Sequence, residues 1–238
     1  MIASNTRKSA REALAGKWKK GVLITLVYFL IEFLISILES AVEDSSVLSL
    51  IVGIANLLIS VPISYGLISS FMKLKRGEDV DIAEFLNYGF SNFSRSWKVA
   101  LQVILKMIIP VVLLIVCILI FVGLMLLSAT QGFQWYFILG VVIYISVLVY
   151  TIAQSYFYSL AQYLAIDNSN MQEKDAVLES QKLMSGHRGD LFLLELSFIG
   201  WAILAVFTLG IGYLWLLPYM QVAKVCFYEE IIGKKESV

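Results

Sequence analysis

Residues 99–127 read VALQVILKMIIPVVLLIVCILIFVGLMLL, and Lys106 is the one charged side chain in this stretch. An α-helix rises about 1.5 Å per residue, so about 20 residues cross the roughly 30 Å hydrocarbon core of a bilayer. The run exceeds that minimum and would be apolar on nearly every face of a helix. It therefore predicts a membrane-spanning helix.

The composition of the whole chain agrees with this prediction. Of the 238 residues, 59% are hydrophobic and 15% are charged, whereas soluble domains have roughly 45–50% apolar and about 25% charged residues. The 18 Lys and Arg residues balance the 18 Asp and Glu residues, so the net charge gives no reason to expect a nucleic-acid partner. The predicted partner is the lipid bilayer.

Apolar runs recur on both sides of 99–127. The last one is too long for a single span, and Gly210 and Gly212 interrupt it, so we interpret it as two helices joined by an outer turn. The prediction is an all-α polytopic protein, a single membrane domain over 1–238, with six transmembrane helices at 21–38, 47–72, 99–127, 135–166, 191–208 and 213–228.

The basic residues predict the orientation of these spans. Apart from Lys106 and Lys224, every Lys and Arg lies before the first span, in alternate loops or at the end of the chain. The remaining loops, 39–46, 128–134 and 209–212, contain neither residue type. Because basic residues are retained on the cytoplasmic side, we expect both termini to be cytoplasmic.

The first span also has features of a secretory signal peptide, since basic residues precede its apolar stretch. However, Glu32 interrupts that stretch, and Glu39 stands where a cleavage site near Ala41 requires a small residue. We expect an uncleaved signal anchor.

Three cytoplasmic segments have the pattern of amphipathic helices: 1–20, 81–97 and 169–184. The first places basic residues around an apolar face, which suits a helix lying on an anionic leaflet. Each segment leads through a short junction into an outgoing span, which suggests three helix-plus-hairpin repeats. The alternative is that interfacial aromatic residues and short polar turns simply recur in polytopic proteins. The junctions are expected at 14–18, 94–98 and 184–188.

Four ionisable residues lie inside the predicted spans, and such residues are costly in hydrocarbon and often functional. They are Glu32, Lys106, Glu195 and Lys224. Glu32 falls near the predicted midplane, whereas the other three lie near the inner boundary. The two lysines could therefore extend to the headgroups, or Glu195 and Lys224 could form a structural pair. A transport or proton-relay role is the alternative.

Polar residues also follow one face of two spans. One face of the second span carries Asn56, Ser60 and Ser64, and one face of the fourth carries Thr151, Gln154, Ser155, Tyr158 and Gln162. These faces could line a hydrated cavity, or they could form hydrogen bonds between closely packed helices.

A further group of residues is expected near lipid headgroups, because aromatic and basic side chains gather at membrane interfaces. These are Lys17, Trp18, Lys19, Trp97, His187 and Arg188. The sequence has no HExxH, Cys-x-x-Cys, phosphate-loop or GxSxG motif, so we predict no catalytic residue, no metal site and no cofactor.

Two stretches carry a family resemblance. Residues 179–201 read ESQKLMSGHRGDLFLLELSFIGW, and residues 11–18 read REALAGKW. With the TLGIG, PY and FYE segments near the end, this pattern resembles the bacterial integral-membrane family catalogued as domain of unknown function 975. The resemblance spans nearly the whole chain and implies a bacterial plasma-membrane protein, but it supplies no activity.

The functional prediction follows from short outer loops and the lack of a catalytic motif. We expect a non-enzymatic accessory or scaffold protein of the cell envelope, which acts through helix–helix or lipid contacts and has an unidentified membrane-protein partner. The alternative is a small transporter or a lipid- or ion-handling protein that uses Glu32, Lys106, Glu195 and Lys224.

Overall fold

The computed structural model describes residues 2–131 and 135–236, and every regular element in these ranges is helical. The prediction of an all-α protein is therefore confirmed. In chain order the elements are α1 (Ile2–Leu14), α2 (Trp18–Ala41), α3 (Ser46–Arg76), α4 (Glu84–Ser91), α5 (Phe93–Gln131), α6 (Trp135–Ser155), the 3₁₀ turn η1 (Tyr156–Tyr158), α7 (Ala161–Asp167), α8 (Glu173–Met184), α9 (Arg188–Leu196), α10 (Ile199–Phe207) and α11 (Tyr213–Glu236).

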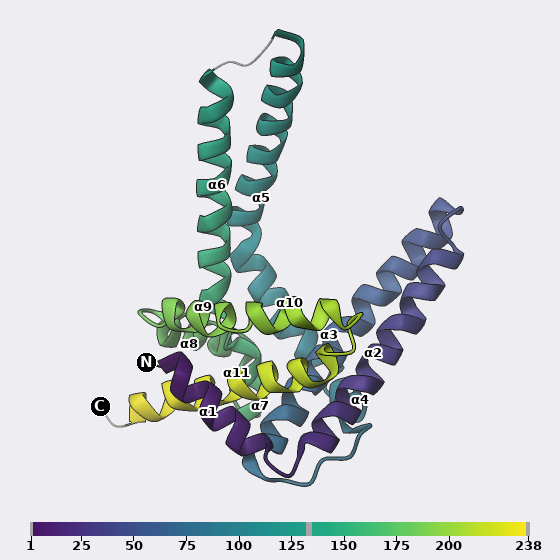
Figure 1. The fold of residues 1–238 in the computed structure, drawn as a ribbon, viewed down its shortest axis with the longest axis vertical. Helices are drawn as coiled ribbons and strands as arrows, with labels where there is room; N and C mark the ends of the chain where they lie inside the picture. Colours follow the sequence, from purple (N-terminus) through teal and green to yellow (C-terminus); the bar gives the residue numbers. More distant parts are fainter. Residues whose placement is uncertain (1, 132–134, 237–238) are drawn as a thin grey trace.

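The long helices form three hairpins that leave a common base in different directions (Figure 1). The pair α5–α6 stands upright in this view, and α2–α3 inclines away from it. The third hairpin, in which α9 and α10 lead out and α11 returns, lies across the other two. The short helices α1, α4, α7 and α8 gather at the base, where both ends of the chain also lie.

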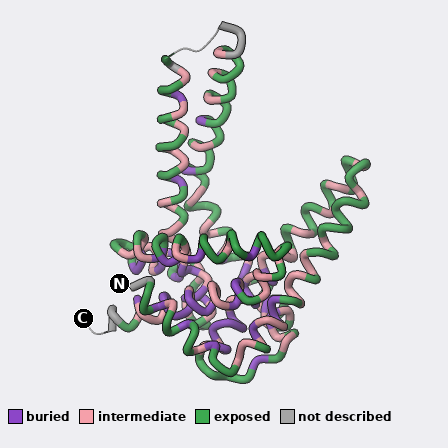
Figure 2. Tube along the Cα trace, in the orientation of Figure 1, coloured by how far each residue is buried: buried purple, intermediate pink, exposed green. Residues whose placement is uncertain are grey.

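Buried residues concentrate in this base (Figure 2). We call it the hub: α1, α4, η1, α7 and α8, with the ends of the long helices that pack on them. The largest fully buried side chains all belong to it: Leu14, Ile24, Ile63, Tyr65, Phe71, Met72, Leu74, Phe85, Leu160, Met184, Phe227 and Tyr228.

The outer parts of the first two hairpins are different. We call residues 26–61 and 100–150 the arms. In the first arm, which the structure describes in full, no residue is buried, and many of its large apolar side chains are exposed. In the second arm, Pro110, Cys117 and Gly140 are the buried residues among those whose side chains are described. An apolar surface of this extent needs lipid or another protein to cover it.

Five helical stretches of the described chain are long and apolar enough to cross a membrane, which indicates a membrane-embedded protein. They are Trp18–Ala41, Ser46–Arg76, Phe93–Ser128, Phe137–Asp167 and Arg188–Phe207. They correspond to the first five predicted spans.

The sixth predicted span, 213–228, is helical but is not among these stretches. Lys224, Glu229 and Glu230 lie in α11 and interrupt its apolar character. The prediction of six spans is therefore not confirmed. In Figure 1 the third hairpin also runs across α5 and α6 and is not parallel to them.

The fourth predicted span, 135–166, is not one continuous helix. It is interrupted at η1, where Ser180 of α8 enters the backbone ladder. Its hydroxyl accepts a hydrogen bond from the Leu160 amide at 3.2 Å and donates one to the Phe157 carbonyl at 2.8 Å. A side chain inserted between backbone groups is a recognised cause of a helix break.

Two glycines allow α3 and α4 to pack closely. A Cβ on Gly66 would lie 1.8 Å from the Phe85 carbonyl oxygen, and a Cβ on Gly89 would lie 2.2 Å from the Pro62 oxygen. The two helices therefore touch backbone to backbone, which only glycine permits.

The junctions that lead into the outgoing helices share a backbone geometry at two places. Gly16 and Gly186 have φ of 75° and 93°, and the following residues, Lys17 and His187, have φ/ψ of −114°/1° and −110°/2°. The junction predicted at 94–98 is wrong, because these residues lie within α5 and the break between helices falls at Asn92.

Candidate functional site

A cavity of about 330 Å³ lies in the hub where the three hairpins converge. We call it the central cavity. Every hairpin contributes to its wall, which consists of Tyr28, Ser64, Leu67, Ile68, Ser159, Leu160, Tyr163, Leu191, Glu195, Leu217, Gln221 and Lys224.

The charged centre of this cavity is an ion pair between α9 and α11. Lys224 Nζ lies 2.7 Å from Glu195 Oε1, and both side chains remain about one-third exposed. The Tyr156 hydroxyl donates to the second carboxylate oxygen, Oε2, at 2.6 Å. Each oxygen of Glu195 therefore has a partner, and the carboxylate neutralises the charge of Lys224.

The other polar groups of the central cavity are hydroxyl and amide groups. Gln221 lies one helical turn from Lys224, and Ser64 and Ser159 come from the other two hairpins. Such groups can bind a polar or zwitterionic molecule by hydrogen bonds. In the described residues, no cluster of His, Cys, Asp or Glu could hold a metal ion.

Of the four predicted intramembrane charges, the structure brings Glu195 and Lys224 together. Glu32 is half-buried on α2, next to Tyr28, and does not line the central cavity. Lys106 is exposed on α5. The four charges therefore do not form one site.

The predicted polar faces reach the central cavity only at Ser64 of the second span. Asn56 donates to Glu39 Oε1 at 2.8 Å, near the tip of the α2–α3 hairpin. Gln154 and Gln162 are half-buried, and the central cavity is lined by other residues.

Two of the predicted interfacial residues donate hydrogen bonds to backbone carbonyls of α3. The Trp97 indole donates to the Leu58 carbonyl at 3.1 Å, which is the carbonyl that loses its helical partner because Pro62 has no N–H. Lys17 Nζ donates to the Leu74 carbonyl at 3.0 Å, at the end of α3.

The other interfacial candidates lie on the hub surface. His187 Nδ1 lies 3.0 Å from Asp190 Oδ2. The Arg188 guanidinium lies 4.0 Å from the Phe157 ring centroid, which is a cation–π geometry. Trp18 lies beside Tyr219, with 6.3 Å between ring centroids and 57° between the ring planes, and Lys19 is exposed.

Sequence reasoning missed an ionic cluster that joins the returning helices. The Arg76 guanidinium contacts Asp167 at 2.7 Å and Glu229 at 3.2 Å, and Lys75 also pairs with Glu229. The Tyr228 hydroxyl donates to Asp167 at 3.0 Å. The available signal was that each of the three returning helices carries a charged residue at its inner end.

It also missed the role of Arg95. This guanidinium donates to four carbonyls at the end of α7 and in the segment after it, at 2.8–3.2 Å, those of Ala165, Asn168, Ser169 and Met171. It thereby holds the loop that leads into α8.

A family model described as "Protein of unknown function (DUF975)" matches residues 1–235, so the chain belongs to this family. No curated protein and no solved structure matches the chain.

Proposed function

We propose that this DUF975 member is a non-enzymatic accessory or scaffold protein of the bacterial plasma membrane, which acts through helix–helix or lipid contacts. The observation that carries the proposal is the contrast between the packed hub and the diverging arms. A transporter needs helices closed around a pathway, whereas these arms leave their apolar faces open to neighbours in the membrane.

The orientation of the proposal follows from the charges and the ends of the chain. Basic side chains such as Arg76 and Arg95 lie in the hub, which supports a cytoplasmic position of the hub. The Thr6 hydroxyl donates to Glu230 at 3.3 Å, and α1 packs on α11. Because the two ends meet, the number of crossings must be even.

We propose six crossings, with α11 as the sixth. Support comes from Arg188–Phe207, which is long and apolar enough to cross and must return to the hub. A cysteine in place of Leu209, at the tip of the third hairpin, tests this in a Cys117→Ala, Cys226→Ala background. Labelling by a membrane-impermeant maleimide on intact cells is expected, with Lys19→Cys as the protected control. Labelling from the cytoplasmic side alone would mean four crossings.

We further propose that the hub is built from three equivalent helix-plus-hairpin units. Counted from Lys17, Asn92 and His187, the same four positions are buried in each unit. They are Ala10, Leu14, Gly21 and Ile24; Phe85, Gly89, Ser96 and Val99; and Ser180, Met184, Leu191 and Leu194.

The returning helices support the same equivalence. Each has an irregularity, at Pro62, at Tyr156 where η1 begins, and at Pro218. Counted from these residues, the same five positions are buried: 66, 67, 69, 70 and 71; 160, 161, 163, 164 and 165; and 222, 223, 225, 226 and 227.

Photo-crosslinking tests the scaffold role. A photoreactive amino acid is placed singly at arm positions that are more than half exposed: Leu34, Leu57, Leu119 and Val142. We expect one face of an arm to give a protein adduct of discrete mass in membranes, either with a second copy or with another protein. The same probe at Val99, which is buried in the hub, is the control. Lipid adducts alone at all four positions would contradict the proposal.

A second candidate, handling of a small polar or zwitterionic solute, is favoured by the ion pair in the central cavity. Such a solute could bind Glu195 in place of Lys224, or bind Lys224 in place of Glu195. Cysteine accessibility separates the two functions. A scaffold predicts that a hydrophilic thiol reagent reaches Ser64→Cys from the cytoplasmic side only and does not reach Glu32→Cys. Reaction of Glu32→Cys from the outside and Ser64→Cys from the inside would favour a pathway.

A further inference from the structure

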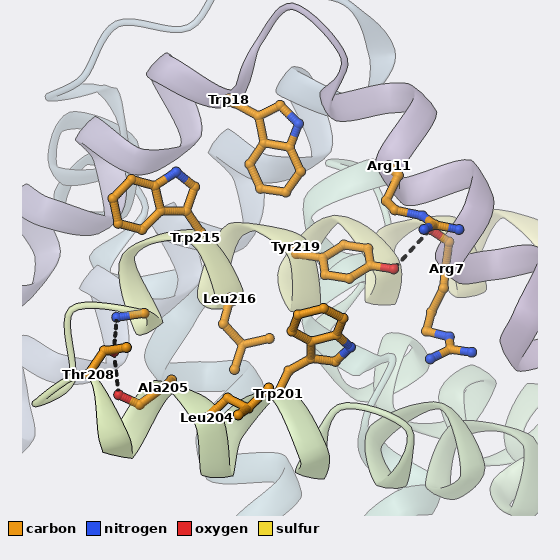
Figure 3. A pocket seen from close by; sticks show the side chains of 11 residues that line it. Arg7, Arg11, Trp18, Trp201, Leu204, Ala205, Thr208, Trp215, Leu216 and Tyr219 are labelled. Atoms are coloured by element: carbon orange, nitrogen blue, oxygen red, sulfur yellow. Dashed lines mark hydrogen bonds between the residues drawn. The ribbon is translucent and has the colours of Figure 1, made fainter.

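A second cavity, of about 520 Å³, lies between α1 and the α10–α11 hairpin (Figure 3). We call it the lateral cavity. Its lining combines two arginines, four aromatic residues and a small apolar end: Arg7, Arg11, Trp18, Trp201, Leu204, Ala205, Thr208, Gly212, Trp215, Leu216 and Tyr219.

The two ends of the lateral cavity differ in polarity. Arg7 and Arg11 of α1 lie at one end, beside Tyr219, whereas Thr208 and Trp215 lie at the other (Figure 3). The Thr208 hydroxyl donates to the Ala205 carbonyl at 2.7 Å and accepts from the Gly212 amide at 2.9 Å. Its polar groups are already used, so the far end is effectively apolar.

The arginines of this cavity differ from those elsewhere in the hub. Arg76 pairs with carboxylates, and Arg95 donates to carbonyls. In the described part of the chain, Arg7 and Arg11 have no carboxylate within ion-pair distance, and the buried Arg7 Nε has no hydrogen-bond partner. A buried guanidinium nitrogen without an acceptor is costly. The two side chains lie four residues apart on α1, so they face the same side of the helix.

The tyrosine of the cavity joins its two walls. The Tyr219 hydroxyl donates to the backbone carbonyl of Arg7 at 3.3 Å, and its ring packs edge-on against Phe198, with 5.0 Å between centroids. These contacts attach α1 to the third hairpin and keep the arginines at the cavity mouth.

We propose that the lateral cavity binds an anionic phospholipid, with its phosphate between Arg7 and Arg11 and part of an acyl chain along Trp201, Trp215 and Leu216. A guanidinium pair matches phosphate oxygens in charge and geometry. Because the rest of the cavity is apolar, a phospholipid fits it better than a free polar anion. The volume suits a headgroup and the first part of a chain, since ligand cavities of roughly 300–1,000 Å³ are typical.

The placement of the phospholipid in the cytoplasmic leaflet rests on the proposed function, because that proposal puts α1 at the inner membrane surface. The binding itself does not depend on it. In nanodiscs both faces of the bilayer are accessible, so a wrong orientation would be detected by the Leu209→Cys experiment and would leave lipid binding unchanged.

Tryptophan quenching provides the test. Trp18, Trp201 and Trp215 line the lateral cavity, whereas Trp97 and Trp135 lie in the α5–α6 hairpin. The full chain, with Trp97→Phe and Trp135→Phe, is placed in phosphatidylcholine nanodiscs that contain brominated phosphatidylglycerol or, separately, brominated phosphatidylcholine. We expect stronger quenching by the phosphatidylglycerol at equal mole fraction.

The variant Arg7→Gln, Arg11→Gln is expected to weaken phosphatidylglycerol binding about tenfold or more, because two charge-assisted contacts are lost. The matched control is Lys8→Gln, Lys19→Gln, which removes the same charge from the same segment through exposed lysines and should change binding little. Equal losses in both variants would overturn the proposal, since they would show general attraction to an anionic surface.

Two further measurements complete the test. Leu204→Trp fills the apolar part and leaves both arginines in place, so it should also abolish the preference for phosphatidylglycerol. Retained preference in Leu204→Trp would overturn the proposed chain position. Inorganic phosphate should not displace the lipid, and full displacement would show that a free anion is the ligand. Circular dichroism confirms that each variant is folded.

Discussion

The hub and the arms both contain large apolar side chains, but these side chains have different surroundings. Phe71 in the hub is 0% exposed, whereas Phe33 in the first arm is 62% exposed. In the hub, side chains from three hairpins and four short helices exclude solvent and lipid. In the arms, each helix contacts its hairpin partner, and its other faces need lipid or another protein. Hydrophobicity alone therefore does not distinguish a core residue from a membrane-facing one.

The largest expected difference in stability is between alanine variants of these two phenylalanines. Phe71→Ala should lower the free energy of unfolding in detergent by about 4 kcal/mol, because it leaves a cavity among packed neighbours. Phe33→Ala should change it by about 0.5 kcal/mol or less, because detergent fills the space. Thermal unfolding followed by circular dichroism measures both. Equal losses would mean that the arms are as tightly packed as the hub.

A second comparison uses two glycines of the same helix, α3. Gly66→Ala should destabilise the protein by about 3 kcal/mol or more, because its methyl group would meet the Phe85 carbonyl. A Cβ on Gly53 would meet no described atom within 4 Å, so Gly53→Ala should stabilise the helix slightly, by up to about 1 kcal/mol. Proteolysis rates in detergent give an independent measurement. If both variants behaved alike, the close approach of α3 and α4 would be wrong.

The third comparison concerns serine hydroxyls. Ser180→Ala should cost about 2 kcal/mol, because the buried Leu160 amide would lose its acceptor. Ser146 in the second arm is exposed and bonds only to its own helix, at Val142, so Ser146→Ala should cost less than about 0.5 kcal/mol. Hydrogen exchange at Leu160 should increase in Ser180→Ala alone. Unchanged exchange would contradict the role of Ser180 in the helix break.

The smallest effect is expected for the charges. Glu195→Gln should cost about 1 kcal/mol, since the pair with Lys224 is partly exposed and its loss is cushioned by solvent. Lys106→Met, which removes an exposed charge from the second arm, should be close to neutral. The double variant Glu195→Gln, Lys224→Met should recover part of the loss. A stability loss for Lys106→Met as large as that for Glu195→Gln would show that the arm also contains a structural ion pair.

Much of the helical layout could be predicted from local composition. A stretch such as 99–127 is too apolar to be exposed to water, so we expect it to lie in the membrane. There it must form a helix, because only a helix pairs all the backbone N–H and C=O groups of a single segment. The contacts of the candidate site residues were harder to predict. Trp97 has the residue type and the position of an interfacial anchor, yet its indole satisfies the Leu58 carbonyl, because Pro62 in another helix removed the usual donor.

Consecutive residues were enough to predict an all-helical, membrane-embedded protein, because hydrophobicity and helix length are local properties of the chain. Which polar groups meet depends on the tertiary structure. Glu195 finds Lys224 from another helix, and Arg76 reaches Asp167 across 91 positions of the chain. The tertiary structure also places an apolar cavity beside Arg7 and Arg11. Such contacts depend on how the hairpins pack at the hub, and no local pattern contains that information.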